Sequence, residues 1–305
     1  MTAQSSPSAK LTLGPILFNW PAETWRDFYF RIADEAPVDI VYLGEVVCSK
    51  RAPFFEPYLP EVAERLHGAG KEVVWSTLAL IVSEREMDAV RALAAAPDIL
   101  VEANDISCVA LLAGRPHVVG PFVNVYNEAT MTCLVERGAA RVVLSNELSA
   151  RALAALAKAA GAELEVQVFG RLPLAISVRC YHARAHNLHK DGCQYVCADD
   201  PDGMALETLD GEAFLAVNGT QTMSYTCCNL VLELDRLLKM GIGCFRLWPH
   251  STDMVAVTRI FRGVLDGRDD AAAAWARLAR LANVAPFANG FYHGQEGAKL
   301  VGAQP

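Results

Sequence analysis

Short runs rich in β-branched residues alternate with longer amphipathic stretches along most of this chain, which is the pattern of repeated strand–helix units. Strands are expected at residues 11–17, 38–44, 72–77, 99–103, 119–125, 140–145, 163–169 and 242–247. Helices are expected at 21–34, 60–68, 84–96, 105–113, 127–137, 147–160, 230–240 and 252–264, and an Ala-rich helix at 270–283. Eight strands, each followed by a helix, predict an α/β protein with a (β/α)8 TIM-barrel-like fold.

The segment 170–228, which follows the seventh predicted strand, does not fit this alternation. It is rich in Gly, Asp, His and Cys, and a hairpin is expected within it near 205–217. An insertion after a barrel strand lies on the face where the strands end, which is where barrel enzymes keep their chemistry. We therefore expect residues 1–305 to form a single barrel-like domain with a cysteine-bearing insertion after strand 7.

Three cysteines lie close together in this insertion. Cys180 and Cys193 enclose twelve residues, and Cys193 and Cys197 enclose three. Cys48 follows the second predicted strand, so it should emerge on the same face of the barrel. Thiols spaced in this way in a reduced protein suggest zinc or iron–sulfur ligation, but the spacing matches neither a zinc ribbon nor a bacterial ferredoxin. The spacing thus predicts a metal site and leaves the metal open.

The residues around the thiols bear on which metal would bind. A four-thiolate iron–sulfur centre is anionic, so nearby cations would stabilise it. Three histidines in the same stretch are possible rival ligands, although a solvated loop face is the more ordinary role for each. The expected cations are Arg171, Arg179, Arg184 and Lys190, and the histidines are His182, His186 and His189.

Composition limits the class of protein. The chain has 305 residues, 52% of them hydrophobic and 20% charged, which is typical of a globular enzyme with a large core. Its net charge of −8 argues against general nucleic-acid binding. The first ten residues are polar with no apolar run behind them, no stretch is long enough to span a membrane, and the nine cysteines are an odd number. We therefore expect a cytoplasmic protein with reduced thiols.

Other polar and sulfur-bearing residues have ordinary alternatives. Cys108 and Cys133 lie on apolar helical faces and should pack in the core, and Cys244 should face the barrel interior. Arg246 shares that interior strand face, where it would bind an anionic ligand or form an internal salt bridge. The remaining residues follow or end strands and should point toward the barrel mouth, but none is singled out as catalytic: Glu45, Asn104, Asn124 and Asn146.

Several stretches of the chain resemble a known family. VFGRLPLAISVRC at 168–180, KDGC at 190–193 and the following Cys197 are similar to the collagenase-like peptidases. The stretches YLGEVVCSKR, GRLPLA, RCYHAR and NGTQTMS, which begin at 42, 170, 179 and 218, resemble the members of that family that act in oxygen-independent ubiquinone biosynthesis.

The resemblance implies a [4Fe–4S] cluster held by Cys48, Cys180, Cys193 and Cys197. It also implies a heterodimer with a UbiU-like protein that carries its own cluster, a UbiT-like lipid-binding accessory protein, and prephenate as a small anionic oxygen donor. The expected activity is hydroxylation of the ubiquinone precursor ring without dioxygen. Cys227 and Cys228, near the last stretch, are alternatives for the fourth ligand.

Peptidase activity is not expected, because the chain has neither a G-x-S-x-G elbow nor an H-E-x-x-H zinc helix. A protein whose zinc or cluster is purely structural, and which serves as a binding scaffold for its partner, remains an alternative to the redox subunit.

Overall fold

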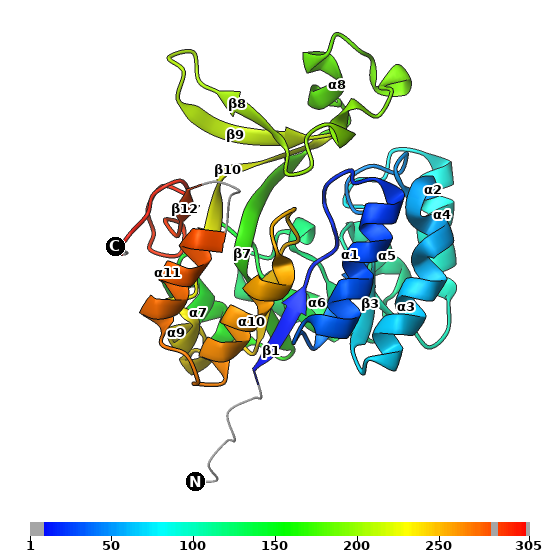
Figure 1. The fold of residues 1–305 in the computed structure, drawn as a ribbon. Coiled ribbons are helices and arrows are strands. Elements are labelled where there is room, and N and C mark those ends of the chain that lie inside the picture. The colour runs from blue at the N-terminus through cyan, green and yellow to red at the C-terminus, as the bar shows by residue number, and fades with distance from the viewer. Residues whose placement is uncertain (1–8, 282–285, 303–305) are drawn as a thin grey trace.

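Eight parallel strands form a closed barrel in the computed structural model, which describes residues 9–281 and 286–302. The last of these strands, β11, pairs with both β1 and β7 and so closes the sheet on itself. The predicted (β/α)8 barrel is therefore confirmed (Figure 1). Its strands are β1 (Lys10–Leu13), β2 (Ile40–Leu43), β3 (Glu72–Ser76), β4 (Leu100–Ala103), β5 (His117–Val119), β6 (Ala139–Val143), β7 (Glu163–Ile176) and β11 (Cys244–Leu247).

Helices surround the barrel as expected, with small differences at their ends. Helix α10 illustrates why they form: the Asp253 side chain caps its first turn, and its apolar face is buried against the barrel. The predicted helix 270–283 begins at Ala271, and residues 282–283 lie outside the described part of the chain. The ring comprises α1 (Ala22–Glu35), α2 (Ala52–Phe55), α3 (Leu59–Gly68), α4 (Glu84–Ala95), α5 (Ile106–Leu111), α6 (Glu128–Glu136), α7 (Ala150–Ala159), α9 (Leu234–Lys239), α10 (Met254–Leu265) and α11 (Ala271–Leu281).

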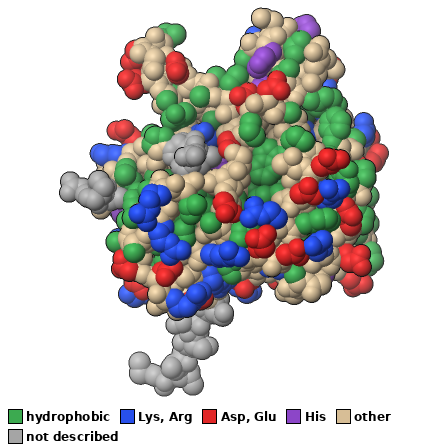
Figure 2. All heavy atoms as spheres, viewed as in Figure 1, with side chains coloured by type: hydrophobic (Ala, Val, Ile, Leu, Met, Phe, Trp, Pro, Cys, Tyr) green, Lys and Arg blue, Asp and Glu red, His purple; other side chains and the backbone are tan. Residues whose placement is uncertain are grey.

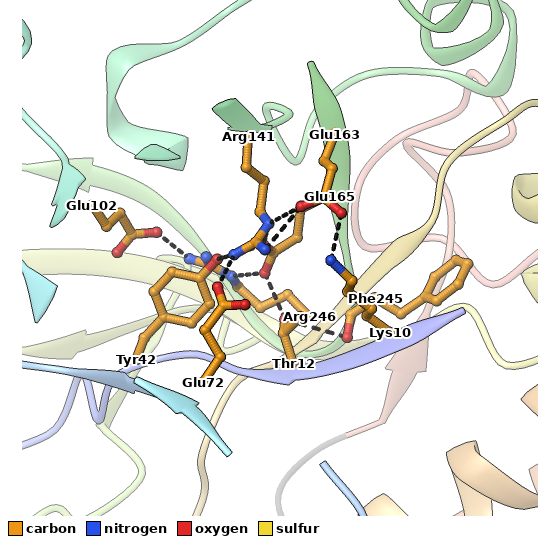
Figure 3. Close-up of polar contacts among 10 residues, drawn as sticks. All are labelled: Lys10, Thr12, Tyr42, Glu72, Glu102, Arg141, Glu163, Glu165, Phe245 and Arg246. Carbon is orange, nitrogen blue, oxygen red and sulfur yellow. Dashed lines mark hydrogen bonds and ion pairs between the residues drawn. The ribbon is translucent and has the colours of Figure 1, made fainter. Parts of the chain in front are cut away.

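The barrel interior holds a network of buried charges (Figure 3). Arg246 is fully buried, with Nε 2.7 Å from Glu165 Oε1 and Nη1 2.7 Å from Glu102 Oε1. Its guanidinium also lies 4.0 Å from the centre of the Tyr42 ring. Of the two roles considered for Arg246, the structure therefore shows the internal salt bridge.

The segment 170–229, here called the arm, rises from the barrel on the continuation of β7 (Figure 1). Residues of the first half of β7 pair with β6 and β11 in the barrel, and those of the second half pair with the antiparallel strand β10 (Gln221–Asn229). The change of partner occurs around Gly170, whose φ is +109°, and a Cβ there would lie 2.7 Å from Trp248 Cβ. Glycine is needed at this bend because a side chain has no space.

The arm consists of the predicted hairpin and a second part made of short helical segments. The hairpin expected near 205–217 is formed by β8 (Met204–Glu207) and β9 (Ala213–Asn218), and β9 in turn pairs with β10. Helix α8 (Tyr181–Ala185) and the short helical turns η3 (Lys190–Gly192) and η4 (Val196–Ala198) make up the other part. A short strand after the barrel, β12 (Phe287–Ala288), pairs with β10. Among the described residues, no helix is both long and apolar enough to cross a membrane.

Candidate metal centre

The four predicted cysteine ligands lie around one small cavity, here called the cysteine cavity. Cys48 lies in the loop that follows β2, on the barrel, whereas Cys180, Cys193 and Cys197 belong to the arm. The described residues contain no three Cys, His, Asp or Glu side chains placed to hold a single metal ion. The thiols therefore border a shared space rather than converge on one point.

The loop that presents Cys48 is fixed by its own backbone contacts. The carboxylate of Glu45 accepts hydrogen bonds from the backbone N–H groups of Val47 and Cys48, at 2.8 and 2.9 Å. From the arm, the Thr220 hydroxyl donates a 2.8 Å hydrogen bond to the carbonyl of Val47. These contacts tie the barrel loop to the arm beside the cavity, so Cys48 has a defined position relative to the other three thiols.

Two of the arm thiols accept hydrogen bonds from N–H donors. The Sγ of Cys180 caps α8 and accepts from the backbone N–H of Ala183 at 3.4 Å. The Sγ of Cys197 accepts from the Asn19 side-chain amide at 3.3 Å. Burial raises the pKa of the Cys180 thiol, as it does for Cys48, because a thiolate is costly in a poorly hydrated site. Donors aimed at sulfur offset that cost and favour the thiolate.

A buried cation, Arg51, lies beside the thiols. Its side chain is 2% exposed, and its Nη1 and Nη2 donate to the Leu17 carbonyl at 3.0 Å and to Asn218 Oδ1 at 2.7 Å. Its Nε has no hydrogen-bond partner among the described residues. The positive charge of Arg51 lowers the pKa of the Cys48 thiol, although burial outweighs this effect. The site therefore contains a buried positive charge that could offset negative charge on the sulfurs.

Of the four cations expected from the sequence, only Lys190 lines the cavity. Arg179 and Arg184 are exposed, and Arg171 lies elsewhere, hydrogen-bonded to the carbonyls of Asp202 and Ser224. The expectation for those three was wrong, because proximity in sequence to a cysteine does not fix the direction of a side chain. Arg51 and Lys50, which also line the cavity, were not singled out.

Of the three histidines considered as rival ligands, only His182 lines the cysteine cavity. His186 and His189 are exposed, and Figure 2 shows histidine side chains at the surface of the outer end of the arm. His182 is buried, with Nδ1 3.2 Å from the Val217 carbonyl and Nε2 3.1 Å from Asp200 Oδ2. Burial lowers the pKa of the His182 imidazole, which favours its neutral form. Both of its ring nitrogens therefore face oxygen atoms.

Comparison with known proteins shows which family this chain belongs to. The model of peptidase family U32 matches residues 24–302, which include all four cysteines of the cavity. The chain belongs to peptidase family U32. The predicted membership of the collagenase-like peptidases is thereby confirmed at the level of the family.

Solved barrel structures resemble this U32 protein only distantly. A tryptophan synthase complex from Pyrococcus furiosus aligns over 90% of this chain and 96% of its own, at 11% identity and a TM-score of 0.41. A tryptophan synthase from M. tuberculosis aligns over 63% and 84%, at 17% identity and a TM-score of 0.36. A type I 3-dehydroquinate dehydratase from Clostridium difficile aligns over 53% and 76%, at 13% identity and a TM-score of 0.35. Likeness of this degree carries no inference about activity.

The other thiols of this U32 chain do not line the cysteine cavity. Cys227 and Cys228 are buried on β10 where it pairs with Arg171 and Gly170, and burial raises the pKa of the Cys227 thiol to about 12. Cys108 is buried as predicted, and Cys244 is buried on β11. Cys133 is exposed, so its predicted core position was wrong; Met131 and Leu134 form the buried face of α6 instead.

The residues expected at the barrel mouth lie in different surroundings. Glu45 supports the Cys48 loop, and Asn104 is buried with its amide donating to the Thr77 carbonyl at 3.1 Å. Asn124 and Asn146 line a separate cavity of about 230 Å³ between the mouth and the arm. The structure therefore does not bring these four side chains together in one catalytic group.

Proposed function

We propose that this U32 protein is a UbiV-like iron–sulfur subunit of an oxygen-independent hydroxylase that acts on the ubiquinone precursor ring. It would work as a heterodimer with a UbiU-like protein, together with a UbiT-like lipid-binding accessory protein and a small anionic oxygen donor such as prephenate. The observation that carries the proposal is the meeting of Cys48 with three arm thiols around one cavity beside a buried cation.

The donor set suits a [4Fe–4S] cluster. Such a cluster takes one thiolate at each of four irons, and its potential depends on net charge and on hydrogen bonds to sulfur. Here Cys48, Cys180, Cys193 and Cys197 would be the ligands, the N–H donors from Ala183 and Asn19 would stabilise the sulfurs, and Arg51 would offset negative charge. When bound, the cluster would supply one-electron redox chemistry.

The cations around the thiols support the proposal that this chain shares the reaction with a partner. Two of the thiols' three cationic neighbours are engaged in holding the site: Arg51 donates to Leu17 and Asn218, and Lys50 donates to the Lys190 carbonyl and to Asp191. The role of this chain would be to hold and insulate the redox group, while the partner contributes to binding the ring or the oxygen donor.

Metal analysis of anaerobically purified protein tests the cofactor. We expect about four iron and four sulfide per chain, as one cubane cluster requires. Stoichiometric zinc with negligible iron would overturn the iron–sulfur assignment. Co-purification with a UbiU-like protein, measured in the same preparation, tests the heterodimer separately.

Deletion of the gene tests the pathway. Ubiquinone synthesis should stop in anaerobic cells and continue in air, where dioxygen-dependent hydroxylases can act. Undiminished anaerobic ubiquinone would reject the proposal. A cysteine variant that lacks metal, still binds its partner and still supports anaerobic synthesis would instead favour the scaffold function.

A further inference from the structure

A pocket of about 260 Å³ lies between the Cys48 loop, α2 and α4, outside the barrel wall. Its inner surface is mostly apolar and includes the half-buried Trp75 of β3. The Cys48 loop contributes Gly44, Glu45 and Ser49 to one wall. The apolar lining consists of Ala52, Pro53, Phe55, Leu59, Trp75, Leu78, Ala89, Val90 and Leu93.

The charges around this pocket disfavour an anion inside it. Glu45, Glu56 and Glu86 line it, against one cation, Arg85. Glu56 and Arg85 are both exposed, so solvent screens both charges, and the half-buried Glu45 and Glu86 remain. Glu86 already accepts hydrogen bonds from the Ser49 hydroxyl at 2.6 Å and the Val82 N–H at 2.8 Å. Apolar contact would strengthen the binding of a ligand here, and a negative charge on the ligand would weaken it.

We propose that this pocket binds one uncharged, ring-sized apolar molecule. An apolar cavity of about 150 Å³ is enough to bind benzene, so a pocket of 260 Å³ accommodates one ring with a few substituent atoms. Trp75 and Phe55 offer aromatic surface for such a ring. This binding depends on the pocket's own residues and not on whether Cys48 holds a metal.

A second hollow of about 320 Å³ shares lining residues with both the pocket and the cysteine cavity. This hollow shares Ser49, Pro53 and Arg85 with the apolar pocket. On its other side it shares Lys50, Cys193 and Tyr195 with the cysteine cavity. A ring bound in the pocket would therefore lie beside the loop that carries Cys48.

Calorimetric titration with p-cresol tests the proposal on the full chain. Ala89 is exposed on α4 and lines the pocket, so Ala89→Trp should fill the entrance and weaken p-cresol binding at least tenfold. Ala92, which is exposed on the same helix and does not line the pocket, gives the matched control. Ala92→Trp should bind p-cresol like the unaltered protein, and circular dichroism of both variants checks that α4 is intact.

A second ligand separates apolar binding from binding of organic acids. p-Toluate has nearly the shape of p-cresol but carries a carboxylate, and we expect it to bind at least tenfold more weakly. Equal binding of p-cresol to Ala89→Trp and to the unaltered protein would show that p-cresol does not bind in this pocket. Equal binding of p-toluate and p-cresol would show that the pocket does not select uncharged ligands. If Ala89→Trp does not fold, Ala89→Phe makes the same test with a smaller obstruction.

Discussion

The guanidinium of Arg51 lies against the backbone of Gly219, so closely that a Cβ at residue 219 would be 2.2 Å from Arg51 Nη2. Gly219 also has a φ of +69°, a conformation that side-chain-bearing residues rarely adopt. The arm therefore leaves space at this one position for a cation that comes from the barrel.

Substitution of Gly219 by Ala should displace Arg51 and loosen the cysteine cavity. Gly211→Ala is the matched control, because Gly211 has a φ of +85° but nothing within 4 Å of its Cβ position. Both variants carry backbone strain of about 1–2 kcal/mol. Gly219→Ala should lose a further ~1–3 kcal/mol, because the displaced Arg51 leaves its buried hydrogen-bond partners unsatisfied. Urea unfolding measures the free energy of unfolding of each variant. Equal losses of stability in the two variants would mean that the contact between Arg51 and Gly219 contributes nothing.

Metal retention should distinguish the four cavity thiols from the others. Cys48→Ala should lose bound iron even though Cys48 lies far from the other three in sequence, because it lines the same cavity. Cys133→Ala and Cys108→Ala should retain iron, since one thiol is exposed and the other is buried in the helical layer. Iron analysis of purified variants checks this. Loss of iron from Cys227→Ala or Cys228→Ala but not from Cys48→Ala would reassign the fourth ligand.

Replacement of Glu165 by Gln should destabilise the barrel strongly. Glu165 is fully buried, and it accepts hydrogen bonds from the Tyr42 hydroxyl at 2.6 Å and from Arg246 Nε at 2.7 Å. Removal of one partner from a buried ion pair costs about 3–5 kcal/mol. The loss should lie near the lower end of that range, because Glu102 Oε1 still lies 2.7 Å from Arg246 Nη1. Denaturant unfolding should show this loss, whereas Glu61→Gln on the exposed face of α3 should change stability by less than about 0.5 kcal/mol.

The same carboxylate should make stability depend on pH. Although burial acts in the opposite direction, the charges of Arg246 and Arg141 hold the pKa of Glu165 below its ordinary value. Its contribution is therefore complete above the ordinary glutamate pKa of about 4.3 and is lost as the pH falls through the lowered folded value. The free energy of unfolding should decrease more steeply with acid in the unaltered protein than in Glu165→Gln. Parallel curves would show that Glu165 does not carry this dependence.

The barrel could be predicted from sequence because most of its strands are short runs rich in β-branched residues, bounded by amphipathic stretches. The strand predicted at 119–125 was misplaced: β5 ends at Val119, and Pro121–Val123 form a helical turn. The arm could not be predicted in full, because the residues of β10 read QTMSYTCCN, a polar and small-residue mixture without alternation. Its pairing is set instead by β7, which continues past the barrel for the rest of its fourteen residues. This is tertiary context overriding a weak local signal.

The thiols of the site were predictable and its central cation was not. Cysteine is rare and its spacing carries information, whereas Arg51 is one of many cations in the sequence. Its importance comes from a contact with Asn218, 167 residues away, and from the space left by Gly219. Two local signals could have pointed to it: Arg51 follows Cys48 closely, and it ends the stretch YLGEVVCSKR that carries the family resemblance.

The division of the cysteines between barrel and arm has a further consequence for how the chain folds. Any group bound by Cys48 together with the arm thiols would act as a reversible cross-link between two parts of the native fold that lie far apart in the sequence. Unlike a disulfide, which persists in the unfolded chain, it would stabilise the native state through its binding free energy, because only the folded chain brings the four thiols together. Acquisition of that group and docking of the arm would then be one thermodynamic event, so its removal should expose the arm to proteolysis before the barrel.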